Sequence, residues 1–336
     1  MFAILKELIS LLLCIKYDIC HILCNNAVKV MKKTPLAKNF NFYGQNDQTA
    51  PDATLRVVVA TSIRNIGGDD KIGSTVKVGD QELYLKGTLE SLLDATNVGA
   101  QYINKISVVG VVVDDMPQTD QLYGYSALPD PQNHNWIIPS NYQYRGQPIA
   151  DLVQHIPSSF RALPLEDKSA RRHAKEEFEK AVLQYADQVQ ADVILSDHLM
   201  LKIERMHTVM PTVNIHPAVT RPDSPYMCRG KIITAEIINR ANQNGSTQTG
   251  ATLHFINDNF DDGLIIADAD HVQIMSGTSE ELVRHQVYQE AKNPLVIEGL
   301  IHLANNMDYF CQATAANAVE EQQHVDNAAN VLVNRL

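Results

Sequence analysis

Short runs of β-branched and apolar residues recur along the chain, and longer segments with a helical spacing of apolar positions separate them. Runs of this kind are typical of buried parallel strands, and they cover residues 55–61, 106–113, 192–195 and 211–215. The charged segment 166–189 is predicted to be a helix, because its apolar side chains recur at helical intervals. Strands that alternate with helices predict an α/β fold, a mostly parallel, twisted, Rossmann-like sheet with helices on both faces.

Two insertions are expected within this domain, which should extend over residues 55–303. Residues 75–85 alternate between polar and apolar positions and predict a β-hairpin, and a short helix is expected at 88–96. Residues 116–165 are rich in proline and in turn-forming residues, which predicts a long excursion with little regular structure. The hairpin and the excursion together make residues 62–165 an expanded part of the domain.

The two ends of the chain are expected to lie outside the domain. Residues 1–54 predict an N-terminal extension and linker, because the apolar run at 8–15 is too short to span a bilayer and no small-residue cleavage site follows it. An alternative for this extension is a zinc site made from Cys14, Cys20, His21 and Cys24. Another is that Met31 is the natural start. Residues 304–336, in which Arg335 is the one Lys or Arg, are expected to form a C-terminal tail.

Composition narrows the class of function. The formal net charge of −11 provides no general basic field for a phosphate backbone, so nucleic acid is not expected as a partner. Five cysteines are too few and too unevenly spaced for a disulfide scaffold of 336 residues, which makes a reducing cytoplasm the expected location. Stable membrane insertion is not expected, and assembly into a homo-oligomer stays an open alternative.

The candidate chemistry lies where the predicted strands end. In parallel sheets, ligands bind beyond the carboxyl ends of the strands. The fourth strand ends in Asn214-Ile215-His216-Pro217, and positions i and i+2 of an extended segment point to the same side. An amide donor beside a titratable imidazole suits acyl transfer, because the amide binds a developing oxyanion and the imidazole moves a proton. Asp261, in an acidic loop between two further apolar segments, is a natural partner for the histidine.

These motifs together resemble the folate-dependent formyltransferase family. Asn-x-His-Pro at 214–217 is followed by Gly-x-Thr-x-His-Phe at 250–255 and by Asp-x-Gly-x-Ile-Ile at 261–266, and 289–297 resembles the closing helix of the glycinamide ribonucleotide type. The resemblance covers about 55–61 and 191–303. It implies the Rossmann-like formyltransferase fold and the transfer of a formyl group from 10-formyltetrahydrofolate to an amine.

The resemblance also implies roles for individual residues. Asn214, His216 and Asp261 match the family's catalytic Asn, His and Asp, which implies that Asn214 and a protonated His216 stabilise the oxyanion while Asp261 supports the imidazolium. No metal is implied. His254 also matches a family position, and we expect it to face away from the catalytic group as a structural residue. The segments that match the family's folate cleft are Leu199, Met200 and Leu201, for which simple core packing is the alternative, and Ile256, Asn257, Asp258 and Asn259.

The acceptor is expected to be a small-molecule amine or hydroxylamine, such as a ribonucleotide amine, an amino sugar or a modified ornithine. The family's Gly-Ser-Asn phosphate turn is not recognisable after the first strand, where Arg64 could pair with an acceptor anion instead. Arg229 could help to position the acceptor, or could form only a surface salt bridge. The acidic tail is too short for a tRNA-binding barrel.

Three alternatives to this function are open. The first is the phosphoribosylglycinamide formyltransferase of purine synthesis. The second is a folate-binding relative without catalysis, against which the intact Asn, His and Asp set argues. The third, a Rossmann dehydrogenase, lacks a Gly-x-Gly-x-x-Gly motif after the first strand.

Overall fold

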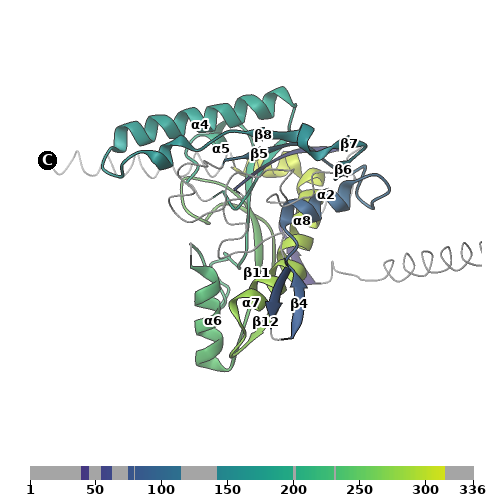
Figure 1. Cartoon of the computed structure of the whole chain (residues 1–336), viewed down its shortest axis with the longest axis vertical. Helices are drawn as coiled ribbons and strands as arrows, with labels where there is room; N and C mark the ends of the chain where they lie inside the picture. Colours follow the sequence, from purple (N-terminus) through teal and green to yellow (C-terminus); the bar gives the residue numbers. More distant parts are fainter. Residues whose placement is uncertain are drawn as a thin grey trace, which may run out of the picture. The chain divides into compact units, whose positions relative to one another are not determined.

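The computed structural model describes residues 39–44, 54–62, 75–78, 80–114, 142–199, 202–230 and 232–314. Its centre is an eight-stranded sheet with the strand order β1-β12-β11-β10-β9-β2-β5-β8 (Figure 1). The strands are β1 (Phe40–Phe42), β2 (Leu55–Thr61), β5 (Ile106–Val113), β8 (Val153–His155), β9 (Val193–Asp197), β10 (Thr212–His216), β11 (Ser246–Phe255) and β12 (Ile265–Met275). Strands β8, β5, β2, β9 and β10 are parallel, whereas β11, β12 and β1 pair antiparallel to their neighbours. The predicted mostly parallel α/β sheet is therefore confirmed.

Helices cover both faces of this sheet, as the alternation of elements predicts. The α-helices are α2 (Thr88–Thr96), α4 (Lys168–Gln188), α5 (Met206–Val209), α6 (Ile233–Asn244), α7 (Glu280–Gln286) and α8 (Asn293–Asn305). A π-helix, η4 (Val287–Lys292), joins α7 to α8. Short 3-10 helices lie at η2 (Ile149–Leu152) and η3 (Ser159–Ala162), and two small hairpins are formed by β3 (Thr75–Val78) with β4 (Gln81–Tyr84) and by β6 (Gln143–Tyr144) with β7 (Gln147–Pro148).

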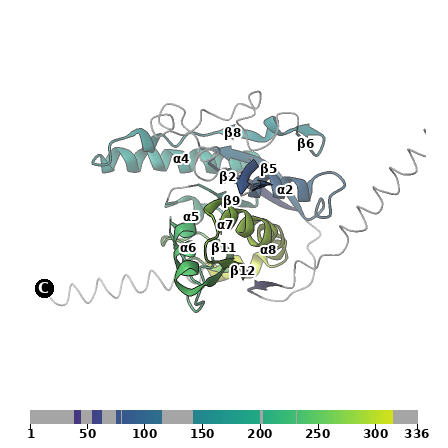
Figure 2. The ribbon, with the colours of Figure 1, turned by 60° about the horizontal axis from the view of Figure 1, so that its bottom comes forward.

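The alternation of side chains along β2 divides the core into two layers. Val58 and Ala60 pack with Phe178 and Val182 of α4 on one face. Val57 and Val59 belong to the larger core on the other face, to which α2, α6, α7 and α8 contribute. Figure 2 shows α4 on one side of β2 and β5, with α7 and α8 on the other side. The parallel strands β2, β5, β9 and β10 are thus largely buried on both faces, which explains their mainly apolar sequences, whereas the edge strand β8 is more exposed.

The main difference at the N-terminal side is strand β1, in a segment that the sequence predicts to be linker. Phe40–Phe42 pair antiparallel with β12, and the side chains beside them bind one buried carboxylate. Asn41 Nδ2 donates to Asp268 at 2.7 Å, and the Tyr43 hydroxyl donates to the same carboxylate at 2.8 Å. Asp268 is fully buried, so these bonds satisfy a group that would otherwise be costly to desolvate. The prediction of an extension and linker over residues 1–54 is wrong for this strand.

Two further differences concern the 116–165 excursion and the C-terminal side. In the described part of the excursion, β8 adds a parallel edge strand next to β5. Beyond residue 303, residues 307–314 are helical and Phe310 is fully buried, with its ring 5.8 Å from that of Phe255. Strand β8 has only three residues, which is too short for its periodicity to be recognised in the sequence. A single aromatic residue in an acidic segment likewise does not predict a buried helix.

Candidate active site

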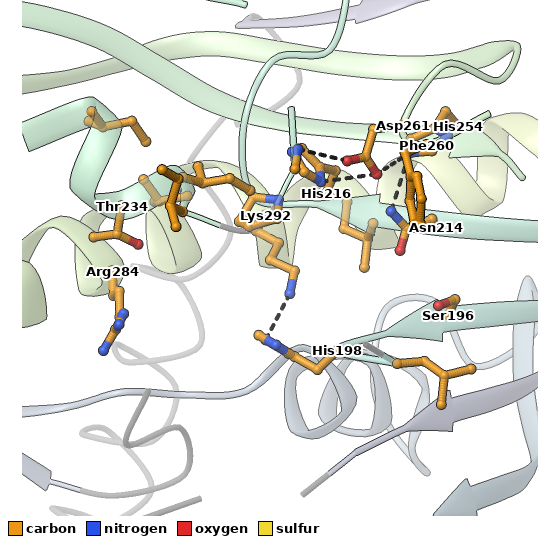
Figure 3. Close-up of a pocket in the computed structure, with 18 of the residues that line it drawn as sticks. Ser196, His198, Asn214, His216, Thr234, His254, Phe260, Asp261, Arg284 and Lys292 are labelled. Atoms are coloured by element: carbon orange, nitrogen blue, oxygen red, sulfur yellow. Dashed lines mark hydrogen bonds and ion pairs between the residues drawn. The ribbon is translucent and has the colours of Figure 1, made fainter. Parts of the chain in front are cut away.

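A cavity of about 580 Å³ opens at the carboxyl ends of β9 and β10, where the sequence predicts the chemistry. Side chains from β9, β10, β11, the acidic loop, α6, α7 and η4 line it (Figure 3). Asn214, His216 and Asp261 are all among them. This volume lies in the range typical of sites for small molecules and cofactors.

The three predicted catalytic side chains converge at one wall of the cavity. Asn214 and His216 project from the same side of β10, as the two-residue period predicts. His216 Nδ1 lies 3.4 Å from Asp261 Oδ1, and the two side chains are 5% and 14% exposed. The structure thus brings an amide, an imidazole and a carboxylate around one space that is open to a ligand.

The other ring nitrogen of His216 faces the main chain. His216 Nε2 donates to the carbonyl oxygen of Cys228 at 3.1 Å, because a carbonyl can only accept a hydrogen bond. Burial lowers the pKa of His216 to about 4, although the charge of Asp261 acts in the opposite direction. At neutral pH the imidazole is therefore uncharged in the free protein, which differs from the protonated His216 that the family resemblance implies.

His254 takes a place that the sequence did not predict. Instead of facing away from the site, His254 lines the cavity, and its Nε2 lies 3.2 Å from Asn214 Nδ2 and 3.9 Å from Asp261 Oδ1. His254 Nδ1 donates to the Phe255 carbonyl at 2.8 Å, and burial lowers the pKa of the ring, so Nε2 carries a lone pair that accepts one N–H of Asn214. This bond fixes which end of the Asn214 side chain is the amide nitrogen.

The loop that carries Asp261 is held in a tight conformation. Asp261 has a φ of 53°, a left-handed conformation that Asp and Asn adopt more readily than most residues. Its Oδ2 accepts the Gly230 N–H at 3.0 Å. At Gly263, a Cβ atom would lie 1.7 Å from the Phe255 carbonyl oxygen, so only glycine allows the loop to close against β11.

Arg229 stabilises the conformation of the same loop. Its guanidinium donates to the Thr220 carbonyl at 2.7 Å and forms an ion pair with Asp262 at 2.6 Å. Arg229 is not among the described side chains that line the cavity. The structure therefore favours the salt bridge, the alternative weighed for this residue, over contact with an acceptor.

The predicted folate contacts divide into three groups. Leu199, Ile256, Asn257 and Asn259 line the cavity. Asp258 points elsewhere, with its carboxylate 3.7 Å from His207 Nε2 and its side chain 73% exposed. Met200 and Leu201 lie outside the described residues. The same is true of Arg64, which is predicted to pair with the acceptor, and of the alternative zinc ligands Cys14, Cys20, His21 and Cys24.

A second polar cluster lies at the cavity, and sequence reasoning missed most of it. Lys292, only 1% exposed, pairs with buried Asp197 at 2.7 Å and also lies 3.2 Å from the Tyr288 hydroxyl and 3.3 Å from His198 Nε2. The pKa of Asp197 is lowered, because Lys292 and His198 outweigh the effect of burial. No sequence pattern indicates that Lys292 would contact Asp197 and His198.

The buried histidines predict a pH dependence of stability. In the unfolded chain His216 binds a proton below about pH 6.5, whereas in the folded protein it does so only near pH 4. Stability should therefore fall as the pH drops from 6.5 to 4, by up to about 3 kcal/mol from this residue. His216→Asn should lose less of its melting temperature over that interval than the wild type. If the wild type and His216→Asn differ in melting temperature by the same amount at pH 7 and at pH 4.5, this prediction is wrong.

Two kinds of feature are absent from the described residues. No helix there is long and apolar enough to cross a membrane. Within the same part of the chain, no group of three or more His, Cys, Asp or Glu side chains is arranged to hold a metal ion.

Comparison with known proteins identifies the class to which this site belongs. Residues 150–298 match the family model described as formyl transferase. A solved structure described as PvdF of pyoverdin biosynthesis, a structurally unique N10-formyltetrahydrofolate-dependent formyltransferase, is 25% identical. It aligns with a TM-score of 0.67 over 75% of this chain and 100% of that chain. Residues 150–298 thus form a formyl transferase domain, and the fold and site of the chain are similar to those of a folate-dependent formyltransferase. The protein is a formyltransferase, and its α/β sheet is that of the family.

More distant solved structures are also named as formyltransferases. Phosphoribosylglycinamide formyltransferase from Campylobacter jejuni subsp. jejuni is 13% identical, with a TM-score of 0.45 over 75% of this chain and 99% of that one. A sugar N-formyltransferase from Shewanella is 16% identical, with a TM-score of 0.41 over 74% of this chain and 70% of that one. Neither similarity is close enough to bear on the acceptor. A sequence search of the curated proteins finds no significant match.

Proposed function

We propose that the protein transfers the formyl group of 10-formyltetrahydrofolate to the amine or hydroxylamine of a small-molecule acceptor, with Asn214, His216 and Asp261 as the catalytic residues. The observation that carries this proposal is the buried His216–Asp261 pair, 3.4 Å apart, beside Asn214 in one open cavity. The named donor of PvdF, N10-formyltetrahydrofolate, supports the same donor for this chain. The apolar side chains Leu199 and Ile256 offer a surface for its pterin ring.

The reaction requires one new bond, one broken bond and one proton transfer. The neutral acceptor nitrogen attacks the formyl carbon, so a carbon–nitrogen bond forms and the formyl oxygen becomes an oxyanion. The bond from that carbon to N10 then breaks, and the proton lost by the acceptor nitrogen is delivered to N10. Tetrahydrofolate and the N-formyl product result, and no oxidant or reductant is needed.

Asn214 suits the stabilisation of the oxyanion. One N–H of its amide is taken by His254 Nε2 at 3.2 Å, and the amide nitrogen carries a second N–H for the formyl oxygen. A donor held in place before the reaction starts needs no reorganisation when charge develops, which is the usual source of large electrostatic effects in enzymes. His254 acts here as a positioning residue.

His216 and Asp261 suit the proton transfer. Because His216 Nε2 is held by the Cys228 carbonyl, the ring nitrogen that faces Asp261 is the one that gains and loses a proton. The carboxylate stabilises the imidazolium that forms as the acceptor nitrogen is deprotonated. In this proposal the imidazole starts neutral and becomes charged only during the reaction, which fits its lowered pKa.

The experiment that tests the function is a screen of acceptors with 10-formyltetrahydrofolate. Purified protein is mixed with the folate and, in turn, with glycinamide ribonucleotide, amino-sugar nucleotides, ornithine and N5-hydroxyornithine, and released tetrahydrofolate is followed by absorbance. We expect one class of amine to be formylated, with the product verified by mass spectrometry. Preference for glycinamide ribonucleotide would assign the protein to purine synthesis. Tight folate binding with no turnover of any amine would instead indicate a folate-binding protein without catalysis.

A further inference from the structure

A row of polar side chains crosses the antiparallel part of the sheet and ends at His216. Asn41 of β1 lies directly opposite Asp268 of β12, and Asp268 lies opposite Thr252 of β11. Thr252 in turn lies opposite His216 of β10. Residues directly opposite each other in antiparallel strands present their side chains to the same face of the sheet. The register therefore places these four side chains on one face, from the edge strand to the proposed catalytic histidine.

The centre of this row is the buried carboxylate of Asp268. Besides the hydrogen bonds from Asn41 and Tyr43, it has an ion pair with Arg221, whose Nη1 lies 3.5 Å from Asp268 Oδ2. A fully buried carboxylate is costly unless it is paired and hydrogen-bonded. Asp268 therefore fixes the position of β1 on one side and of Arg221 on the other.

Arg221 belongs to the loop that follows the catalytic strand, five residues after His216. Its Nη1 donates to the Tyr43 hydroxyl at 3.1 Å, and its Nη2 donates to Asp270 at 3.2 Å. The Tyr43 hydroxyl thus accepts from Arg221 and donates to Asp268 at the same time. A guanidinium donates in fixed directions, so these acceptors on β1 and β12 determine where residue 221 of the loop lies.

Thr252 holds the beginning of the same loop. Its hydroxyl donates to the Ala218 carbonyl at 2.9 Å and accepts the Thr220 N–H at 3.0 Å. Thr252 is fully buried, so both of these bonds are shielded from water. The row on the sheet therefore holds residues 218–221 through Thr252 on β11 and through Arg221 on β12 and β1.

The far side of this loop supplies the main-chain groups that contact the catalytic side chains. The Val219 carbonyl accepts the Cys228 N–H at 2.8 Å, which joins the two sides of the loop. The Cys228 carbonyl accepts His216 Nε2 at 3.1 Å, and the Gly230 N–H donates to Asp261 at 3.0 Å. A shift of the loop would therefore move the hydrogen-bond partners of both His216 and Asp261.

We propose that Arg221 and Tyr43 are positioning residues of the active site, which hold the loop after β10 so that the Cys228 carbonyl fixes the ring of His216. Neither is among the described side chains that line the cavity, so both act through the loop. Tyr43 lies outside residues 150–298, which match the family model, and the inference therefore gives the N-terminal segment a part in the chemistry. Its effect on turnover rests on the proposed function.

Two variants of the full chain test the effect on turnover. Tyr43→Phe removes the hydroxyl that bridges Arg221 and Asp268 and keeps the ring, and Arg221→Gln removes the guanidinium. We expect kcat to fall about tenfold for Tyr43→Phe and on the order of tenfold to a hundredfold for Arg221→Gln, because a small displacement of a catalytic group has effects of this size. The KM for the folate should be nearly unchanged, because neither side chain lines the cavity.

Each variant has a matched control. The Tyr102 hydroxyl donates to Glu298, so Tyr102→Phe also removes a tyrosine–carboxylate bond between distant segments, but outside the row. Arg172→Gln removes an exposed Arg–Glu pair on α4. Both controls should keep wild-type kcat. All kcat values are compared at a temperature well below the lowest melting temperature of the set.

A spectroscopic measurement tests the positioning without any substrate. In nitrogen-15 spectra of histidine-labelled protein at pH 7, the His216 ring should carry its proton on Nε2, because that nitrogen donates to the Cys228 carbonyl. The signal is assigned by its absence from His216→Asn. Tyr43→Phe and Arg221→Gln should shift this signal or speed the exchange of its proton, whereas the two controls should leave it unchanged. If the row only stabilised the fold, the variants would lower the melting temperature and leave both the signal and kcat unchanged, and the inference would be wrong.

The two measurements also separate this inference from the proposed function. A changed His216 signal in a protein that formylates no amine would reject the function and retain the positioning. A changed signal with unchanged kcat would retain the positioning and reject the catalytic role of His216. Formylation by a protein whose His216 signal is the same in the wild type and both variants would retain the function and reject the positioning.

Discussion

Replacement of His216 by alanine is expected to lower kcat by about a hundredfold or more with any accepted amine. The estimate follows from the loss of a group that moves a proton, an effect typically worth about two to four orders of magnitude. The imidazole is held between the Cys228 carbonyl and Asp261, and water that enters the enlarged cavity cannot reproduce that orientation. The measurement is steady-state turnover at saturating folate and acceptor.

A second histidine provides the control for this variant. His173 is exposed on α4, away from the residues that line the cavity, and His173→Ala should retain wild-type kcat. Because His216 is buried and hydrogen-bonded, the melting temperature of His216→Ala is measured as well, and kcat is compared at a temperature well below it. Near-normal turnover by His216→Ala would show that the proposed mechanism is wrong.

Asp261→Asn is expected to reduce turnover by a similar order while leaving folate affinity nearly unchanged. The substitution removes the charge that stabilises an imidazolium next to it, in a buried place where such charges act strongly. It preserves the shape of the side chain, and Asn tolerates the left-handed backbone conformation found at this residue. The amide oxygen can still accept the Gly230 N–H, so the loop should keep its conformation.

The two parts of this prediction are measured separately. Single-turnover formylation gives the chemical step, and equilibrium titration with a non-transferable folate analogue gives the affinity. Asp258→Asn is a matched control, because Asp258 lies in the same acidic loop but its side chain is 73% exposed and does not line the cavity. A parallel loss of folate affinity and turnover in Asp261→Asn would indicate that the carboxylate shapes the loop and does not assist the chemistry.

The central part of the fold could be predicted because its signal is local and strong. Strands β2 and β5 are continuous apolar runs, and the hairpin β3–β4 and the helix α2 were predicted at residues 75–85 and 88–96. The convergence of Asn214 and His216 follows from the two-residue period of a strand. That Asp261 would reach them depended on the family motif, because no local pattern specifies how a loop between β11 and β12 folds back over β10.

Contacts between segments that are distant in the sequence could not be predicted. The ion pair between Lys292 and Asp197 joins residues that are 95 positions apart. A lysine in a helical segment is ordinarily expected to be exposed to solvent, so its burial could not be predicted. The orientation of His254 toward Asn214 depends on which face of β11 meets β10, a choice that a single strand pattern leaves undetermined. Strand β1 needs β12 as its partner before it can be distinguished from a linker.

The hydrogen bond between His216 and position 228 is robust to mutation in a way that most contacts of an active site are not. The acceptor is the carbonyl oxygen of Cys228, an atom that every amino acid supplies. Substitution of the thiol, or its oxidation, would leave the partner of the imidazole in place. Because the Cys228 side chain is buried in the core, other small apolar residues can replace it without altering the polarity of the ring. The positions under constraint are those that fix the course of the main chain, such as Arg229, which anchors the backbone next to that carbonyl through Thr220 and Asp262.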